Sequence, residues 1–296
     1  MKPYPCAVNM KELKQNKMRI KNSLFKTSFV LSVIFLVACQ KKAAPTHSWV
    51  LENSISLEGV NPIGIAALEG QFWLSDGDHN RVVAVNAQGK ITDSIVGLER
   101  PMHLAAHEGQ IWIPQYGADS IVGYNPLSKE RLPLSLSDSL DAPAAVAFFE
   151  NEIAIADFYN HRLLFFNGTD WITIGQEGKK EGDFYYPTDV QITAQNIWVA
   201  DAYNNRVQVF DKSGTFVKVI GVAQKMNAAT GIFVSEDQLF VTDFENHRLL
   251  VFYHDGQLAQ ELTEALEKPI DALINEDRLY VVDYKNSQIN VYYYDH

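Results

Sequence analysis

Residues 48–296 consist of short runs in which apolar and polar side chains alternate, separated by clusters of turn-forming residues. Such alternation is typical of half-buried β-strands. Around Asp201, the turn Asp-Ala-Tyr-Asn-Asn at 201–205 is followed by the alternating run Arg-Val-Gln-Val-Phe. The pattern predicts four short antiparallel strands in this unit, at 186–192, 197–200, 206–210 and 215–220.

The unit around Asp201 recurs with a period near forty residues. Its first turn residue has counterparts spaced 39, 42, 44, 42 and 40 residues apart, at Asp76, Gln115, Asp157, Asp201, Asp243 and Asp283. A strand that starts at a proline, which suits a first position because no ladder donor is needed there, precedes most turns: Pro62, Pro101, Pro143, Pro187, Ala229 (in place of proline) and Pro269. Four strands per forty residues predict a propeller blade, and six copies predict six blades.

The two ends of the repeated region predict how the ring closes. The last copy stops at His296, one strand short of a full unit, whereas 49–57 has the pattern of an extra strand before the first copy. Pairing of this strand with the last blade closes the ring and removes an exposed sheet edge. We therefore expect an all-β fold, a six-bladed β-propeller over 48–296 whose N-terminal strand completes the last blade.

The third, fourth and fifth copies share a distinctive motif. Gly-Gln-Glu-Gly-Lys-Lys-Glu-Gly-Asp-Phe-Tyr-Tyr-Pro at 175–187 is followed by Val-Ala-Asp-Ala-Tyr-Asn-Asn-Arg-Val-Gln-Val-Phe at 199–210, and Asn-His-Arg recurs at 160–162 and 246–248. On these motifs the chain resembles the NHL-repeat family of six-bladed β-propellers. The resemblance covers essentially all of 48–296 and implies the fold, but such a scaffold hosts many functions.

Some propellers that resemble this family are enzymes with a metal in the central region. The resemblance implies two kinds of site, the zinc of amidating lyases, held by several histidines, and the acidic calcium site of lactonase-type propellers. This chain has only His103 at the equivalent ring position, so a three-histidine zinc site is not expected. The sequence also contains no nucleophile elbow, phosphate loop or dinucleotide fingerprint.

Residues 1–38 have the order of an export signal, a basic run followed by an apolar stretch that is too short to favour a stable membrane span. Leu-Val-Ala-Cys at 36–39 resembles the lipobox of bacterial lipoproteins, which implies cleavage before Cys39 and lipidation of its thiol. We expect a signal peptide at 1–38, a lipidated Cys39 with a polar tether at 39–47, and a lipid-anchored protein of the bacterial cell envelope. Gln40 is not the aspartate associated with inner-membrane retention, which favours the outer membrane; the alternative is a soluble secreted protein with a chance cysteine.

The charge balance excludes one class of partner. The whole chain has a net charge of −11, and the leader contributes +6, which leaves −17 for residues 39–296. Nucleic-acid binding needs a cationic surface, so no nucleic-acid partner is expected. The two cysteines are Cys6, lost with the leader, and Cys39, so the mature chain is expected to have no internal disulfide.

Most conspicuous residues have a structural interpretation because they repeat. The Asp-x-x-Asn-x-Arg turn has residue types found in active sites, but its recurrence around the ring indicates a turn-stabilising role. Large and small residues at a fixed offset before each turn indicate packing between blades: Trp73, Trp112, Ala154, Trp198, Phe240 and Tyr280. The acidic residues between first and second strands are interpreted as solvated loop tips: Glu69, Glu108, Glu150, Glu152, Glu236, Asp237, Glu276 and Asp277.

One set of ionisable residues is not repeated in every blade. Two residues past each proline position, small residues alternate with ionisable ones: Gly64, His103, Ala145, Asp189, Gly231 and Asp271. His103, Asp189 and Asp271 come from alternate blades and converge if they point toward the axis. Either they fill a narrow channel together with water, or they bind one divalent cation, calcium or zinc, or the cationic group of a ligand.

The strand starts and the Asp turns share one face of the ring, because successive strands run in opposite directions. We expect the channel mouth on that face, lined by Met102, Thr188, Thr230 and Ile270 and rimmed by Tyr116, Tyr159, Tyr203, Phe244 and Tyr284. The favoured function is a binding scaffold for a protein or small ligand on this face. A metal-dependent lyase or hydrolase at the channel and a purely structural spacer are the alternatives.

Overall fold

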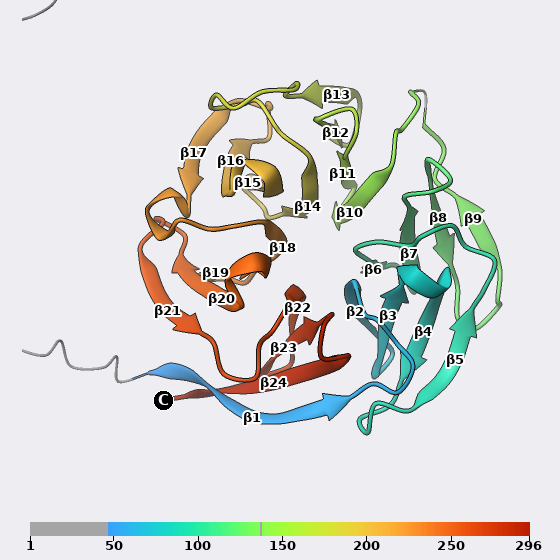
Figure 1. Cartoon of the computed structure of the whole chain (residues 1–296). Helices are drawn as coiled ribbons and strands as arrows, with labels where there is room; N and C mark the ends of the chain where they lie inside the picture. The colour runs from blue at the N-terminus through green and yellow to red at the C-terminus, as the bar shows by residue number, and fades with distance from the viewer. Residues whose placement is uncertain (1–46, 137) are drawn as a thin grey trace, which may run out of the picture. The chain divides into compact units, whose positions relative to one another are not determined.

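The computed structural model describes residues 47–136 and 138–296. The predicted signal peptide and Cys39 lie outside the described residues. The described chain forms six four-stranded antiparallel sheets arranged as a ring around a central axis (Figure 1). Every strand lies between residues 48 and 295, so the ring is complete within this part of the chain. None of the helices in this part is long and apolar enough to cross a membrane.

Each blade is numbered by its place along the chain, and its strands are named in order from the axis outward. Blades one to three comprise β2 (Gly64–Leu68), β3 (Gln71–Asp76), β4 (Arg81–Val85) and β5 (Ile91–Ile95); β6 (Ala105–His107), β7 (Gln110–Gln115), β8 (Ser120–Tyr124) and β9 (Arg131–Pro133); and β10 (Pro143–Phe149), β11 (Glu152–Asp157), β12 (Arg162–Phe166) and β13 (Trp171–Ile174).

Blades four to six follow the same order. They comprise β14 (Pro187–Ile192), β15 (Asn196–Asp201), β16 (Arg206–Asp211) and β17 (Phe216–Ile220); β18 (Ala229–Val234), β19 (Gln238–Asp243), β20 (Arg248–Tyr253) and β21 (Leu258–Leu262); and β22 (Pro269–Asn275), β23 (Arg278–Asp283), β24 (Gln288–Asp295) and β1 (Ser48–Ser56). Single turns of 3-10 helix lie in the connections, at η1 (Gly77–His79), η2 (Ala202–Asn204), η3 (Val222–Gln224) and η4 (Phe244–Asn246).

Strand β1 closes the ring as predicted. It pairs antiparallel with β24 from Ser48 opposite Asp295 to Ser56 opposite Gln288, and the two strands lie side by side in Figure 1. Trp49 anchors the seam: its backbone N–H donates to Gln260 Oε1 at 2.8 Å, and its ring meets Phe240 edge-on at 5.6 Å. Both ends of the propeller therefore contribute to one sheet, in which β1 covers the edge of β24.

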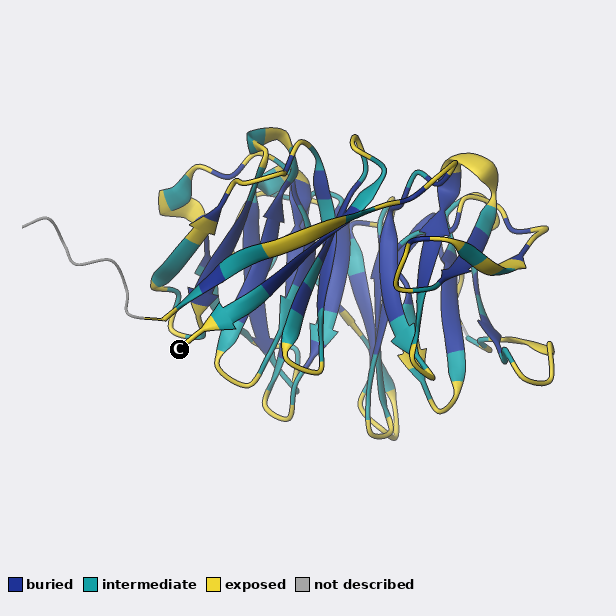
Figure 2. Ribbon diagram, turned by 90° about the horizontal axis from the view of Figure 1, so that it is seen from below, coloured by how far each residue is buried: buried dark blue, intermediate teal, exposed yellow. Residues whose placement is uncertain are grey.

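The core lies between neighbouring blades rather than at the axis. Trp73, Trp198 and Phe240 occupy the predicted large position before the turn and are almost fully buried, while Ala154 supplies the small residue in blade three. The strands carry the buried residues and the connecting loops carry the exposed ones (Figure 2). The alternation read from the sequence thus corresponds to interlocking faces of adjacent sheets.

The innermost strands of blades one and two start later than predicted. β2 begins two residues after Pro62 and β6 begins four residues after Pro101. In blade two, Met102 N–H donates to Pro114 O at 3.0 Å, but Pro114 has no amide hydrogen to donate in return. His103 N–H instead donates to Ala144 O of the next blade at 3.0 Å. The ladder is therefore interrupted where His103 reaches the axis.

Candidate functional site

The six ring positions alternate between small and ionisable residues because the inner strands approach closely at this level. A Cβ on Gly64 would lie 2.7 Å from His103 Cα, and one on Gly231 would lie 2.3 Å from Ile270 O. Real side chains do not tolerate such contacts. Blades one and five must therefore be glycine at this level, which leaves the space at the axis to His103, Asp189 and Asp271.

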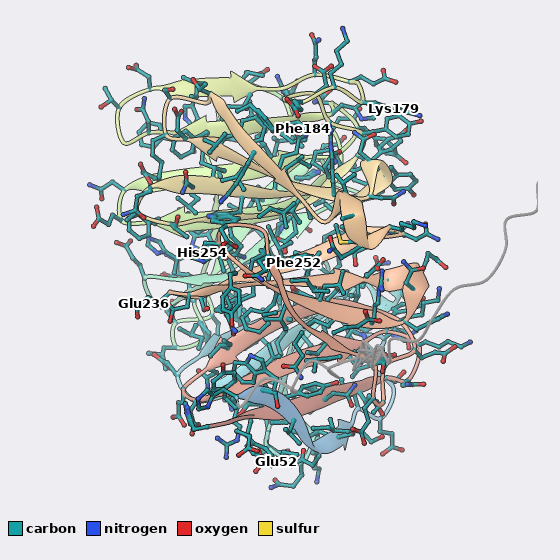
Figure 3. The ribbon with its side chains drawn as sticks, turned by 90° about the vertical axis from the view of Figure 1, so that its left-hand side faces the viewer. Glu52, Lys179, Phe184, Glu236, Phe252 and His254 are labelled. Carbon is teal, nitrogen blue, oxygen red and sulfur yellow. The ribbon has the colours of Figure 1, made fainter. Side chains whose placement is uncertain are left out.

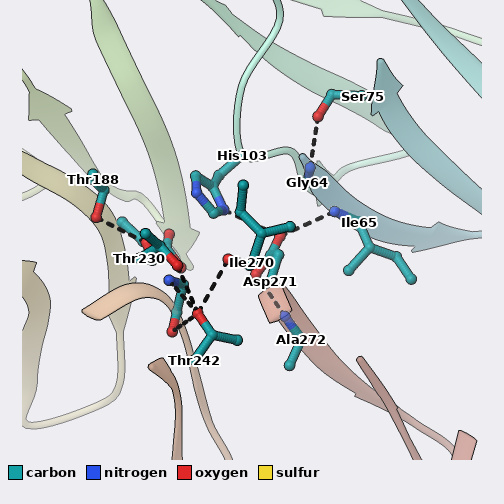
Figure 4. A network of polar contacts seen from close by, with 12 residues as sticks. Gly64, Ile65, Ser75, His103, Thr188, Thr230, Thr242, Ile270, Asp271 and Ala272 are labelled. Carbon is teal, nitrogen blue, oxygen red and sulfur yellow. Dashed lines mark hydrogen bonds and ion pairs between the residues drawn. The ribbon is translucent and has the colours of Figure 1, made fainter. Parts of the chain in front are cut away.

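The two channel carboxylates are held rigidly by backbone amides of their own and the next blade. Asp271 Oδ1 accepts from Ala272 N at 2.8 Å, and its Oδ2 accepts from Ile65 N of blade one at 3.0 Å (Figure 4). Asp189 is held in the same way, with Oδ1 accepting from Val190 N at 2.8 Å and Oδ2 from Ile232 N of blade five at 2.7 Å. The first bond fixes the orientation of each carboxylate, and the second links its blade to the next one.

His103 brings an imidazole against these carboxylates. His103, Asp189 and Asp271 are 3%, 3% and 5% exposed, and one potential ligand atom from each lies within 4.8 Å of the others. His103 Nδ1 is 3.2 Å from Asp271 Oδ2, close enough for an ion pair, yet no well-aligned hydrogen bond reaches this nitrogen among the described residues. The predicted convergence of the three side chains is therefore present, with one buried polar atom left unsatisfied.

The electrostatics of the cluster favour protons on both kinds of group. Burial alone lowers the pKa of His103, but the charges of Asp271 and Asp189 and contact with Asp271 outweigh it and raise the pKa to about 9. Burial raises the pKa of Asp189 to about 7, and the charge of Asp271 adds to this rise while that of His103 opposes it. At neutral pH the site holds an imidazolium and a carboxyl that exchanges its proton readily.

The cluster forms the floor of a cavity of about 310 Å³. The cavity runs from the cluster along the inner strands toward the hairpins that join first to second strands. Its walls include the apolar side chains Phe148, Phe233 and Leu273 together with polar groups at Gln191 and Asn275. A concave space that combines apolar walls with a few fixed polar groups is the usual form of a small-molecule site.

The cavity lies on the other side of the cluster from the expected mouth. None of the four predicted lining residues borders it: Met102, Thr188, Thr230 and Ile270. The hydroxyl groups on that side are hydrogen-bonded: Thr188 Oγ1 donates to Thr230 O at 2.8 Å, and Thr242 Oγ1 bonds to Thr230 Oγ1 at 2.9 Å and to Ile270 O at 3.2 Å (Figure 4). These threonines therefore link blades four, five and six.

The predicted rim residues lie on this same side of the ring, which we call the turn face, and do not border the cavity either. Tyr284 Oη donates to Asp78 at 2.8 Å, and Phe244 lies under Lys268 with 4.7 Å between the ammonium and the ring. The other three belong to one cluster of rings from blades two to four: Tyr116, Phe158, Tyr159, Tyr185, Tyr186 and Tyr203. Their role in ligand binding stays a prediction.

Sequence reasoning missed the cavity walls, although a signal for them is present. Side chains two apart on a strand point to the same face. Moving two residues beyond the six ring positions reaches six residues that all line the cavity: Ala66, Ala105, Ala147, Gln191, Phe233 and Leu273. The pattern of period two could therefore have identified the walls, but not the side on which the space is open.

The repeated turn carboxylates are structural, in agreement with their interpretation from the sequence. Asp201 is fully buried; its Oδ1 accepts from Tyr185 N at 2.8 Å, and its Oδ2 accepts from Arg206 Nε at 2.8 Å and Asn204 Nδ2 at 2.9 Å. The same arrangement recurs around Asp157 and Asp243. It holds each incoming connection against the blade that follows.

Comparisons with known proteins agree with this architecture. Residues 184–210 match the NHL repeat family. A segment of 95 residues is 30% identical to protein brain tumor of Drosophila melanogaster; it covers 29% of this chain and only 9% of that protein.

Two solved structures share the fold at low sequence identity. Virginiamycin B lyase of Staphylococcus aureus is 13% identical with a TM-score of 0.62, covering 83% of this chain and 99% of that one. A gluconolactonase of Xanthomonas campestris is 12% identical with a TM-score of 0.64, covering 84% and 99%. The chain is therefore a six-bladed β-propeller in which residues 184–210 match the NHL repeat.

Proposed function

We propose that this chain is a lipid-anchored envelope protein whose propeller binds a small ligand in the central cavity. The observation that carries the proposal is the floor of that cavity: three buried ionisable side chains, rigidly held, with His103 Nδ1 lacking an aligned partner. Buried polar atoms are almost always satisfied, so ionisable groups with an incompletely satisfied atom at the bottom of a cavity support a ligand that brings a polar group to this floor. The cavity volume suits a small molecule rather than a protein segment.

A cavity-blocking variant tests this proposal. Ala106 borders the cavity yet is exposed, so Ala106→Trp fills the entrance without disturbing the core. Native mass spectrometry of the full chain in mild detergent, against size-matched amines, alcohols, sugars and carboxylates, is expected to show one bound molecule that the variant excludes. Ala223→Trp, at an exposed position in η3, is the control that should bind normally. Binding that survives in Ala106→Trp would contradict the proposal.

The lipid anchor is a separate part of the proposal. It rests on the Leu-Val-Ala-Cys sequence at 36–39 after a basic and apolar leader. Palmitate labelling of bacteria that express the chain is expected to tag the protein and to place it in the outer-membrane fraction. Cys39→Ala should abolish the label, and persistence of the label in that variant would rule out Cys39 as the anchor.

A second candidate is a metal-dependent lyase or hydrolase, favoured by the three convergent ligand atoms of His103, Asp189 and Asp271. One nitrogen and two carboxylates suit zinc better than calcium, which prefers oxygen alone. Bound metal would act as a Lewis acid at the cavity floor. Metal analysis of the purified protein tests this candidate: stoichiometric zinc that disappears in the Asp189→Ala, Asp271→Ala double variant would support it, and metal-free protein that binds a cavity ligand would reject it.

A further inference from the structure

Resting on the proposed cavity function, we infer the chemical class of the ligand: a small organic cation, with an ammonium or guanidinium head at Asp189 and an apolar body against the cavity walls. Three independent features of the described residues support this class. They are the charge around the entrance, the pairing of groups at the floor and the aromatic character of the walls.

The entrance to the cavity is surrounded by acidic side chains. Five of the six hairpins that join first to second strands carry exposed carboxylates at their tips, and no tip carries lysine or arginine: Glu69, Glu108, Glu150, Glu236, Asp237, Glu276 and Asp277. In the side view of Figure 3, Glu236 lies at the face that carries these hairpins, whereas Lys179 lies at the opposite face. A ring of like charge around a low-dielectric opening concentrates ligands of the opposite sign.

Two basic groups beside these hairpins are already paired. Arg278 donates to Glu52 at 2.6 Å and to Asp277 at 2.7 Å. Lys212 forms an ion pair with Glu152. The carboxylates at the tips of the other hairpins therefore make the electrostatic potential at the cavity entrance negative. An anionic ligand would be repelled there before it reached the floor.

At the floor, Asp189 is the carboxylate left to meet a ligand. Asp271 has His103 as its cationic neighbour at 3.2 Å, whereas the hydrogen bonds to Asp189 come from two backbone amides. No lysine or arginine lines the cavity. The charged groups that face Asp189 are therefore His103 and Asp271, whose opposite charges largely offset each other.

The walls favour an organic cation over a bare metal ion. Phe148 and Phe233 border the space, and aromatic faces attract ammonium and guanidinium groups. The volume of about 310 Å³ exceeds the need of a single ion.

Three probes that share a phenylethyl group and differ in head-group charge test the inference: phenethylammonium, phenethyl alcohol and 3-phenylpropionate, titrated calorimetrically into the full chain in mild detergent. The cation is expected to bind at least tenfold more tightly than the other two. Asp189→Asn should weaken it at least tenfold. Because that variant also alters a bond between blades, salt provides a second measurement: raising ionic strength should weaken cation binding to the unaltered protein.

The possible outcomes separate the inference from the proposed function. Preferential, salt-sensitive binding of phenethylammonium supports both. If the alcohol or the carboxylate binds as tightly and Ala106→Trp blocks it, the cavity binds ligands but the cationic class is wrong. If phenethylammonium binds equally well to Ala106→Trp, the cation does not use the cavity and the inference fails. If none of the probes binds the unaltered protein, both the inference and the proposed function are overturned.

Discussion

Two sets of buried carboxylates lie in the same ring, and their surroundings differ. The turn carboxylates are fully buried, and four of the five have an arginine five residues later that donates Nε to them; the set is Asp76, Asp157, Asp201, Asp243 and Asp283. The channel carboxylates Asp189 and Asp271 accept only backbone amides and share one histidine. Four of the five repeated carboxylates are therefore paired with an arginine of their own blade, whereas the two channel carboxylates have no arginine partner within the described chain and line a cavity.

Blade two lacks the turn aspartate that the other blades share. Gln115 replaces the turn aspartate, and its Oε1 accepts from Glu99 N at 3.1 Å while its Nε2 donates to Ser120 Oγ at 3.3 Å. A neutral amide thus substitutes for the ion pair, and the blade still forms. The turn carboxylates therefore stabilise a geometry that other residues can also maintain, which is the behaviour of structural groups.

The largest expected effect is in the turn set. Asp201→Ala leaves Arg206, 8% exposed, without its carboxylate, and breaking a buried ion pair in this way costs about 3–5 kcal/mol of unfolding free energy. Urea denaturation measures the loss. Gln115→Ala is the matched control, where loss of two neutral hydrogen bonds should cost about 1–2 kcal/mol. Equal losses in the two variants would contradict the distinction between charged and neutral turns.

The next effect concerns the close approach of the inner strands. Gly231→Ala would place a Cβ 2.8 Å from Asp271 Cα, and such overpacking should lower the unfolding free energy by about 1–3 kcal/mol. It should also weaken binding of phenethylammonium, because Asp271 has to move. Gly117→Ala, whose nearest neighbour would be Glu99 Cβ at 3.3 Å, is the control. A stable, normally binding Gly231→Ala protein would show that the alternation of small residues is not required.

The unfolding free energy should depend on pH because of His103 and the channel carboxylates. The folded-state pKa of His103, about 9, exceeds its ordinary value of 6.5, so the folded protein keeps a proton that the unfolded chain releases. This stabilisation is complete below about pH 6.5 and is lost as the pH rises through about 9, at up to about 1.4 kcal/mol per pH unit. The raised pKa of Asp189 acts in the same direction at lower pH, from about 4 to about 7.

His103→Gln tests this dependence. Urea denaturation between pH 7 and pH 9 should show a smaller loss of unfolding free energy in the variant than in the unaltered protein, because the group that releases the proton is absent. His161→Gln is the control: His161 accepts a hydrogen bond from Tyr186 N at 3.1 Å on the turn face, and its removal should leave the slope above pH 7 unchanged. Parallel slopes for His103→Gln and the unaltered protein would contradict the assignment.

The smallest effect is expected on the turn face. Tyr203 is 59% exposed and contacts Tyr186 with 4.9 Å between ring centres, so Tyr203→Ala should change the unfolding free energy by about 0.5 kcal/mol or less. Binding of phenethylammonium should be unaffected, because the cavity lies on the other side of the cluster. Calorimetry on this variant would contradict the placement of the site if the affinity fell.

The number of blades, the closing strand and the identity of the three channel residues followed from the chain alone. Hydrophobic alternation indicates local strand structure, and a period near forty residues indicates a repeated unit. Both can be recognised in the sequence without knowledge of tertiary contacts. The recurrence of Asp201 and its counterparts also separated structural carboxylates from Asp189 and Asp271. Lipidation at Cys39 remains a prediction, outside the described residues.

The side on which the cavity opens was decided only by tertiary contacts. Thr188 and Thr242 donate to carbonyl oxygens of the next blade on the turn face, and the late start of β6 lets His103 N–H pair with blade three instead of its own sheet. The threonine contacts join residues on different blades that lie 42 and 28 positions apart. No local sequence pattern determines which hydroxyl donates to which carbonyl of the next blade, because these bonds depend on how the six sheets pack against one another.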